Sequence, residues 1–307
     1  MTRVVPSTRT WGGANRQAFI ERLMGMGFAF PACLLLLLVT IVPLVVLVIL
    51  SFTDYELGAL ELTGVGLDNY AKALTDPVFL RALKNTFLYV AIVLPGSVLL
   101  GLVVAVLVQG RTRTRWIYQV IYFLPVTSTL IAMATVWQAL LHPSLGPVNA
   151  AIRFFGFREV GFLSDPSLVL PTLATIGIWQ LVGFNMVLFM AGLSAIPRDL
   201  YEAAEVDGCT GGIDRFVTIT WPLLGPTTMF VIVTTSITAF KVFDTVAVMT
   251  RGGPAGASEV LLYTVYLEAF QYFHIGYGAA LTMVFLAFVL IFSAIQAFVL
   301  DRRAHYG

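Results

Sequence analysis

Six long apolar stretches constrain this chain more than any other feature of its sequence. The hydrocarbon core of a bilayer is about 30 Å thick and a helix rises about 1.5 Å per residue, so one crossing needs roughly 20 apolar residues. Six stretches reach that length, namely residues 28–50, 87–108, 117–141, 172–193, 223–249 and 277–300. They lack the alternation of apolar and polar residues that marks barrel strands. The sequence therefore predicts an all-α membrane protein with six transmembrane helices.

The composition agrees with a membrane location and argues against several partners. Of the 307 residues, 58% are hydrophobic and 11% are charged, which is too few charges to cover a soluble globule of this size. We therefore expect membrane lipid around the chain. Since 18 basic and 17 acidic residues leave a net charge of +1, we expect no nucleic-acid partner. Cys33 and Cys209 are far apart in the sequence and are expected to be free thiols.

The distribution of lysine and arginine predicts the orientation. Eleven arginines lie in the tails and short loops of one side, and six basic residues lie in longer loops of the other. Because cytoplasmic loops carry the excess of Lys and Arg, both termini are expected in the cytoplasm. The chain then divides into a cytoplasmic tail (1–27), a transmembrane domain (28–300) and a second tail (301–307). In the first tail, a surface helix and a frayed segment both fit the shared apolar face of Phe19, Ile20, Leu23 and Met24.

The most informative polar segment joins the fourth and fifth stretches, at residues 194–222. Pro197 favours a helix start, Asp199 places negative charge in the first turn, and Gly208 favours a left-handed helix stop. The pattern predicts a short helix followed by a turn. Its surface would carry aromatic and acidic side chains, those of Tyr201, Glu202 and Glu205. Physical reasoning alone leaves two alternatives open, a docking site for a partner and a solvated hairpin.

This segment resembles the EAA loop of membrane subunits of binding-protein-dependent ABC importers. The matching residues are Glu202, Ala203, Ala204, Asp207, Gly208, Ile219, Pro222 and Pro226. A second segment resembles the signature of carbohydrate-uptake permeases, through Phe240, Phe243, Asp244, Val246, Thr250, Gly252, Gly253 and Pro254, continued by Tyr263, Tyr266, Ala269, Phe270, Gly276 and Tyr277. Asn69, Tyr70, Asn85 and Thr86 resemble the family's first external loop. The resemblance runs from about residue 28 to the C-terminus.

One departure from the family pattern lies after the EAA residues. Counted from Gly208, the pair Ile219 and Pro222 arrives one residue late, and Trp221 replaces the usual leucine. One added residue rotates a helix by about 100°. We expect the turn at Gly211 and Gly212 to absorb it.

The resemblance implies an ABC importer transmembrane domain of type I, in the plasma (inner) membrane of a bacterium. Two related membrane subunits would form the pathway and two ATPase subunits would drive it. An external solute-binding protein or lipoprotein would deliver the solute. The segment that couples to the ATPase would contain Glu202, Ala203, Ala204, Asp207 and Gly208. ATP and Mg would be bound by the partner ATPase.

The chain itself is expected to bind no cofactor and to catalyse no reaction. It has no G-x-x-x-x-G-K-[ST] phosphate loop, so the glycines of 251–256 are not read as a nucleotide site. Its three histidines, His142, His274 and His305, lack the spacing of metal ligands. No H-E-x-x-H helix or catalytic dyad is evident within the apolar stretches. We therefore expect neither a metal site nor an active site.

Charged residues inside the fifth apolar stretch are the first candidates for the solute path. Lys241 and Asp244 are three residues apart, so on one helix they would face the same side. Neighbouring aromatic and amide candidates for binding sugar rings and hydroxyls are Trp137, Gln138, Trp179, Gln180 and Asn185. An alternative remains open, in which the charges form an ion pair between helices and the tryptophans are interfacial anchors.

The predicted function is ATP-driven import of a sugar, either a mono-, di- or oligosaccharide or a related polyol or sugar phosphate. The main alternative is an ATPase-independent channel or ion-coupled carrier, with Lys241 and Asp244 as a relay. An intramembrane enzyme is a third class, but its catalytic constellation is missing. The EAA segment favours the importer because a carrier that needs no ATPase gives that segment no role.

Overall fold

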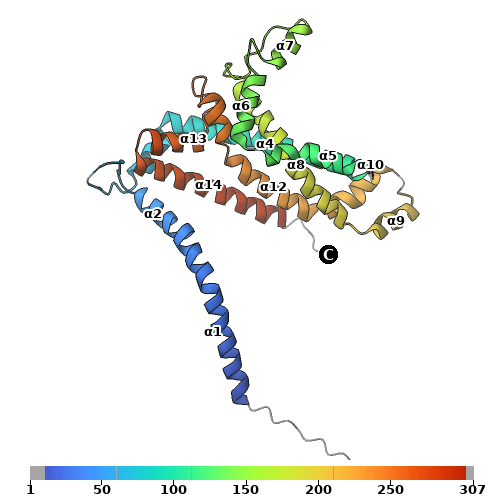
Figure 1. The fold of residues 1–307 in the computed structure, drawn as a ribbon, viewed down its shortest axis with the longest axis horizontal. Coiled ribbons are helices and arrows are strands. Elements are labelled where there is room, and N and C mark those ends of the chain that lie inside the picture. The colour runs from blue at the N-terminus through green and yellow to red at the C-terminus, as the bar shows by residue number, and fades with distance from the viewer. Residues whose placement is uncertain (1–10, 60, 112, 210, 302–307) are drawn as a thin grey trace, which may run out of the picture.

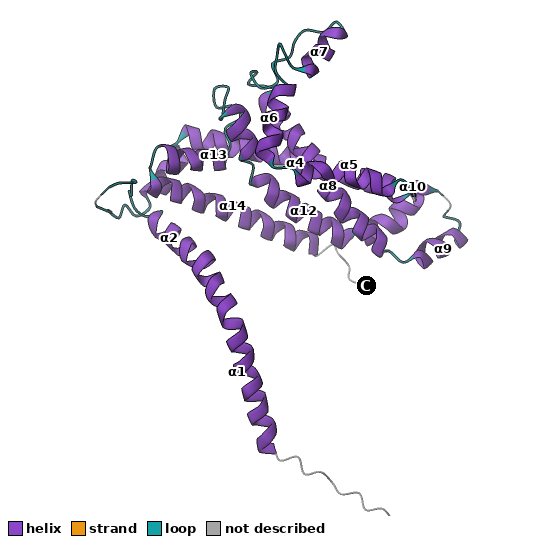
Figure 2. Cartoon of the chain, in the orientation of Figure 1, coloured by secondary structure: helices purple, strands orange, loops and turns teal. Residues whose placement is uncertain are grey.

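The computed structural model describes residues 11–59, 61–111, 113–209 and 211–301, and these residues are overwhelmingly helical (Figures 1 and 2). Within these ranges there is no β-strand, only an isolated antiparallel bridge between Thr53 and Gly64. The predicted all-α membrane fold is confirmed.

Four helical segments are long and apolar enough to cross a bilayer by themselves. They are Met24–Leu50, Pro77–Gln109 (α4), Val169–Ala195 (α8) and Ile275–Gln296, which lies within α14 (Ile275–Asp301). The first combines the end of α1 (Trp11–Leu36), a π-helical turn η1 (Leu37–Ile41) and α2 (Val42–Leu50). These correspond to the first, second, fourth and sixth predicted spans.

The other two spans are bent pairs of helices. Helix α5 (Arg115–Thr127) meets α6 (Leu130–Leu140) at 99°, and Gly212–Leu223 meets α12 (Gly225–Phe240) at 69°. The second bend coincides with Pro226, which has no N–H to continue the helical hydrogen bonding. The predicted count of six holds when each bent pair counts as one span. The fifth span nevertheless does not run as one helix over 223–249, because α12 stops at Phe240.

The core of the bundle forms where α4 and α8 pack together, with α5 and α12 against α8 (Figure 1). Glycines permit these close contacts, because a Cβ at Gly183 would overlap the Tyr122 carbonyl and one at Gly177 would overlap the Tyr89 hydroxyl. Buried residues such as Leu173 and Phe189 fill the space between the helices. The bundle is therefore built around α8.

The first span touches this bundle only at α2, which packs against α14, whereas α1 stands apart, as Figures 1 and 2 show. None of its most apolar stretch is buried, compared with 39% of that of α4 and 44% of that of α8. Helix α1 passes residue 27 without a break, so the boundary between tail and membrane domain remains a prediction. Residues 1–10 and 302–307 of the tails, and the side chains of Phe19, Ile20 and Leu23, lie outside the described residues.

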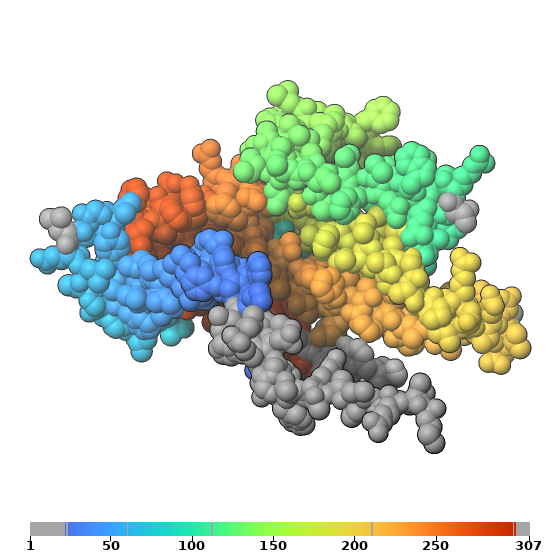
Figure 3. Space-filling model, turned by 60° about the horizontal axis from the view of Figure 1, so that its bottom comes forward, coloured from blue at the N-terminus to red at the C-terminus, as the bar shows by residue number. Residues whose placement is uncertain are grey.

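Most connecting segments gather at two ends of the bundle, whereas the connection at residues 141–168 projects from its side (Figure 1). At one end lie α9 (Arg198–Val206) and α10 (Gly212–Arg215), which project as the yellow and orange tip in Figure 3. The opposite end carries α3 (Asp68–Thr75), α13 (Leu261–Tyr266) and the π-helical η4 (Leu267–Gln271) (Figure 1). The remaining elements are α7 (Pro147–Phe154), η2 (Phe216–Thr220), α11 (Trp221–Leu223) and η3 (Val246–Thr250).

Candidate functional site

The segment at residues 197–215, here called the coupling segment, folds as its sequence predicts. Helix α9 starts directly after Pro197, and Gly208 has φ +91° in the left-handed region. The Cys209 N–H donates to the Ala204 carbonyl at 2.9 Å, and the Gly208 N–H donates to the Glu205 carbonyl at 3.2 Å. This is the Schellman pattern of helix termination. The predicted short helix and its stop are confirmed.

Two side-chain contacts tie the coupling segment to the membrane helices and close it on itself. The Tyr201 and Thr220 hydroxyls are 3.0 Å apart, and Arg215 donates to Glu205 over 2.7 Å. Most of the remaining surface is open, including Glu202, Ala203 and Asp207. Val206 is 88% exposed and Ile213 is 84% exposed. This chain therefore leaves the apolar side chains of the segment uncovered.

A π-helical turn follows the EAA motif and offers a second way to absorb the residue added after Gly208. Residues Phe216–Thr220 form the π-helical turn η2, in which hydrogen bonds span five residues instead of four. Such a turn takes up one extra residue inside a helix, so the turn at Gly211 and Gly212 is not required to do so. Phe216 then packs beside Trp221, with ring centroids 6.3 Å apart.

The two charged candidates lie in a break of the fifth span. Lys241 caps the end of α12, residues 242 and 243 are not helical, and the helix resumes at Asp244. The expectation that both residues share one face of a continuous helix is therefore wrong, and none of the ion pairs among the described residues joins them. Irregular backbone at membrane depth is tolerated where it lines a cavity or is buried in protein. That condition is met here.

The break lines a cavity of about 200 Å³ between α4, α8 and α12. Lys241 and Asp244 both contribute to its wall, and Gln180 reaches it from α8. Tyr89 and Thr238 add hydroxyl groups. The structure therefore brings together three of the predicted pathway residues, although across a break in the fifth span and not along one face of a continuous helix.

The other four candidates lie outside the lining of this cavity. Trp137 and Trp179 pack edge to face with ring centroids 5.4 Å apart. The Gln138 amide donates to the Met249 carbonyl at 3.4 Å. Asn185 is 0% exposed and accepts a hydrogen bond from the Thr235 hydroxyl at 2.9 Å. The contacts of Asn185 are those of a packing residue between α8 and α12.

The opposite end of the bundle holds a tightly tied connection at residues 251–261, here called the external loop after the side on which the lysine and arginine distribution predicts it. The Asn85 amide donates to the Gly256 and Glu259 carbonyls at 3.1 and 2.9 Å, and Arg81 donates to the Ala255 carbonyl at 3.0 Å. The Thr86 hydroxyl accepts from the Leu261 N–H at 2.9 Å. Sequence reasoning missed Arg81. Its spacing of four residues from Asn85, which puts both on one face at the start of an apolar helix, was the available signal.

Glu259 is the titratable group of the external loop with a displaced pKa. Loss of solvent on burial raises the pKa of its carboxyl above the ordinary value of 4.5, against a smaller lowering by the hydrogen bond from Thr264.

Both cysteines are free, as predicted. Among the described residues, no three His, Cys, Asp or Glu side chains are grouped closely enough to hold a metal ion.

Comparison with known proteins decides the family. The profile of the "Binding-protein-dependent transport system inner membrane component" family matches residues 97–305. The chain belongs to this family.

Three relatives are similar to the chain over most of its length. A probable ABC transporter permease protein of Pyrococcus horikoshii is 32% identical over 267 residues, with 86% of this chain and 91% of the relative covered. The sulfoquinovosyl glycerol transport system permease protein SmoG of Agrobacterium fabrum is 31% identical, with 90% and 89% covered. The sn-glycerol-3-phosphate transport system permease protein UgpA of the same organism is 32% identical, with 79% and 83% covered.

Solved structures agree on the fold of this permease. One is described as a bacterial alginate ABC transporter in complex with alginate pentasaccharide-bound periplasmic protein. A chain of that complex superposes with a TM-score of 0.82 at 22% identity, covering 97% of this chain and 99% of that one. A second structure of a bacterial alginate importer gives a TM-score of 0.80 at 21% identity. The chain is a multi-pass membrane permease subunit of an ABC importer, with the type I transmembrane fold, and its family is a transport component instead of an enzyme.

Proposed function

We propose that this permease pairs with a second, related permease to form the inward path for a carbohydrate, and that two cytoplasmic ATPase subunits drive it. The observation that carries the proposal is the coupling segment. It is a short helix with a defined stop, it projects from the bundle, and it leaves Val206 and Ile213 uncovered. Exposed apolar side chains on a rigid polar segment are expected where a partner docks.

The coupling segment has the mechanical properties that transmission of motion requires. Helix α9 follows α8 directly, and η2 leads from it into α12, so both flanking elements are spans of the bundle. A rigid helix fixed between two spans passes a displacement on as rotation of those spans. ATP and Mg act on the ATPase in this scheme, and the permease binds neither. The eleven arginines counted on this side support a cytoplasmic location for the coupling segment and for both termini.

The cavity at Lys241, Asp244 and Gln180 is the proposed solute path. Its lining supplies a cation, a carboxylate, an amide and hydroxyl groups, which suit the many hydroxyl groups of a sugar or polyol. The names of two relatives support this class, since they refer to sulfoquinovosyl glycerol and sn-glycerol-3-phosphate. A mono-, di- or oligosaccharide, a polyol and a sugar phosphate all belong to it. An external binding protein, which the family name specifies, would deliver the solute.

The exposed apolar surface of the first span supports the proposal of a second permease subunit. Helices α1 and α2 carry an apolar surface that their own bundle does not cover, and a neighbouring membrane subunit together with lipid would cover it. Gentle purification tests the assembly. We expect an ATPase subunit and a second permease to accompany the chain. Solute uptake into liposomes by the chain alone would contradict the importer and favour an ion-coupled carrier.

The solute path is tested by Asp244→Asn in the assembled complex. We expect uptake of the transported sugar to fall about tenfold or more while ATPase activity persists, because a carboxylate that contacts sugar hydroxyls is worth one or two charge-assisted hydrogen bonds. Asp68→Asn, at an exposed position in the first turn of α3 and outside both the cavity lining and the coupling segment, is the matched control for loss of one carboxylate. Unchanged uptake by Asp244→Asn would remove this residue from the path.

A further inference from the structure

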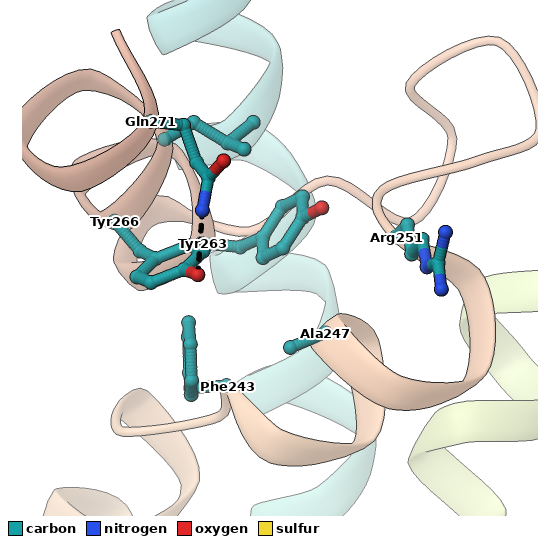
Figure 4. A pocket seen from close by; sticks show the side chains of 7 residues that line it. Phe243, Ala247, Arg251, Tyr263, Tyr266 and Gln271 are labelled. Carbon is teal, nitrogen blue, oxygen red and sulfur yellow. Dashed lines mark hydrogen bonds between the residues drawn. The ribbon is translucent and has the colours of Figure 1, made fainter.

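A second and larger cavity opens beside the external loop. Its volume is about 490 Å³, and Figure 4 shows its lining. The wall combines aromatic rings from Phe243, Tyr263 and Tyr266 with the polar groups of Arg251 and Gln271. These residues come from four segments, namely the break in the fifth span, the external loop, α13 and η4. The cavity is therefore assembled by the fold and is not a feature of one loop.

The aromatic rings form a connected wall. Phe243 lies edge to face against Tyr266 at 5.4 Å, and Tyr263 is near-parallel to Tyr266 at 6.2 Å. The Gln271 amide donates to the Tyr266 hydroxyl at 2.8 Å, drawn as a dashed line in Figure 4, which fixes that ring. A sugar ring has apolar faces and a polar edge of hydroxyl groups. The flat aromatic rings match the faces, and the hydroxyl and amide groups that border them match the edge.

Arg251 supplies a positive charge at the edge of this wall. In the view of Figure 4 it lies beyond Tyr263, on the side away from Tyr266. Its backbone is left-handed, with φ 50° and ψ 40°, a conformation that costs free energy for a residue with a side chain. Among the described residues no carboxylate pairs with its guanidinium. An unpaired guanidinium beside an aromatic cavity is suited to an anionic group on a ligand.

Phe243 connects this cavity to the proposed solute path. Its side chain lines both cavities, the larger one at Arg251 and the smaller one at Lys241 and Asp244. The two cavities are thus adjacent, and the Phe243 ring lies between them. The larger cavity lies on the side of the external loop, where a binding protein would release its solute.

We propose that the larger cavity is the first external subsite for a carbohydrate that carries an anionic substituent, which pairs with Arg251 while the sugar ring stacks on Tyr263 and Tyr266. The proposal rests on the importer function above and narrows its substrate class. A neutral sugar would use the aromatic wall but would leave the guanidinium without a partner. A wholly apolar ligand would leave the Gln271 amide and the tyrosine hydroxyls unmatched.

The test compares glucuronic acid with glucose, which differ by a carboxylate at carbon 6. Binding of each to the whole complex in nanodiscs, without ATP, is measured by saturation-transfer NMR. We expect glucuronic acid to bind about tenfold more tightly than glucose, as one charge-assisted pair would give. Arg251→Asn should bring glucuronic acid to the level of glucose, because asparagine tolerates the left-handed backbone but lacks the charge. Arg251→Lys should retain part of the preference.

Two further variants separate the subsite from nonspecific effects. Tyr266→Ala should weaken both sugars, since it removes the stacking face and not the charge. Arg158→Gln, which removes an exposed arginine remote from the cavity lining, should change neither. Equal binding of the two sugars by the unaltered complex, or full retention of the preference in Arg251→Asn, would overturn the proposal. Because the measurement uses no ATP, failure of an ATPase to co-purify would count against the importer function and not against this subsite.

Discussion

The coupling segment and the external loop connect spans at opposite ends of the bundle, yet they are held in different ways. Both contain glycines with positive φ, Gly208 in the first and Gly252 and Gly256 in the second. The external loop is tied to α4 by the side chains of Asn85 and Arg81, and its last two residues, Val260 and Leu261, are buried. The coupling segment is held by two polar contacts and leaves apolar residues in solvent.

The difference indicates which end needs another protein. Several polar backbone groups of the external loop are hydrogen-bonded within the chain, which fixes the loop beside the wall of the larger cavity. The helix stop fixes the backbone of the coupling segment, but apolar side chains on its surface remain uncovered. The permease therefore carries a preformed solute-facing end and a partner-facing end, and the following changes should separate the two.

The largest effect is expected from Gly208→Val. A β-branched residue in the left-handed region costs roughly 1–2 kcal/mol or more, so the stop of α9 should be lost. ATP-driven uptake by the reconstituted complex should fall about tenfold or more, with less ATPase retained on purification. Gly58→Val is the matched control, because Gly58 has φ +96° and equally open surroundings but lies at the other end. Equal loss in both variants would remove the distinction between the ends.

A smaller effect is expected from Asn85→Ala at the external loop. The change removes the donor shared by two loop carbonyls, which should lower the free energy of unfolding by about 1–3 kcal/mol. Thermal unfolding of the purified complex and proteolysis within 251–261 measure it. ATPase retention should be normal. The control is Lys84→Ala, an exposed neighbour on the same helix. If the ATPase were lost as well, the two ends would not be independent.

The next prediction concerns pH and Glu259. Because burial raises its pKa in the folded protein, this carboxyl favours folding while protonated, and that contribution is lost as pH rises through the raised pKa. Glu259→Gln should therefore stabilise the permease at neutral pH and leave it nearly unchanged at pH 4. Melting temperatures at the two pH values measure the difference. A stabilisation by Glu259→Gln that is the same at both pH values would contradict this origin.

The smallest effect is expected from Glu205→Gln. Its ion pair with Arg215 is short, but the two side chains are 64% and 32% exposed, so the pair should contribute less than about 1 kcal/mol. Uptake should fall less than about threefold, and the difference should shrink at high salt. A double-mutant cycle with Arg215→Gln isolates the pair. A loss as large as that of Gly208→Val would mean that the ion pair, and not the helix stop, holds the coupling segment.

Local signals were readable from the sequence because they depend on neighbouring residues. Pro197 and Gly208 marked the start and stop of α9 correctly, since backbone preference at a helix end is a property of one or two residues. Among the described residues, the apolar stretches likewise located the four single-helix spans and the bent pair at 115–140, whereas the other bent pair covers 212–240 and not the predicted 223–249. The break at Lys241 could not be predicted in this way, because the hydropathy averaged over residues 223–249 is that of one continuous helix.

Contacts between distant segments could not be predicted. The hydrogen bonds from Asn85 to the external loop cross more than 170 residues, and nothing in either segment alone identifies the other. Asn185 was an amide within an apolar span, which fits a solute path and a helix contact equally well until the packing of α8 is known. The candidate site was therefore only partly predictable, because three of its seven pathway residues converge through tertiary structure.

Cysteine accessibility at Ala203 shows whether the coupling segment faces the cytoplasm and docks the ATPase. In a background of Cys33→Ser and Cys209→Ser, Ala203→Cys would be treated with a membrane-impermeant maleimide, with Gly58→Cys as the reference for the opposite end. We expect Ala203→Cys to be labelled only in inverted vesicles stripped of ATPase, and we expect rebinding of the ATPase to protect it. Labelling from the outside of intact cells, or labelling that the ATPase leaves unchanged, would contradict this expectation.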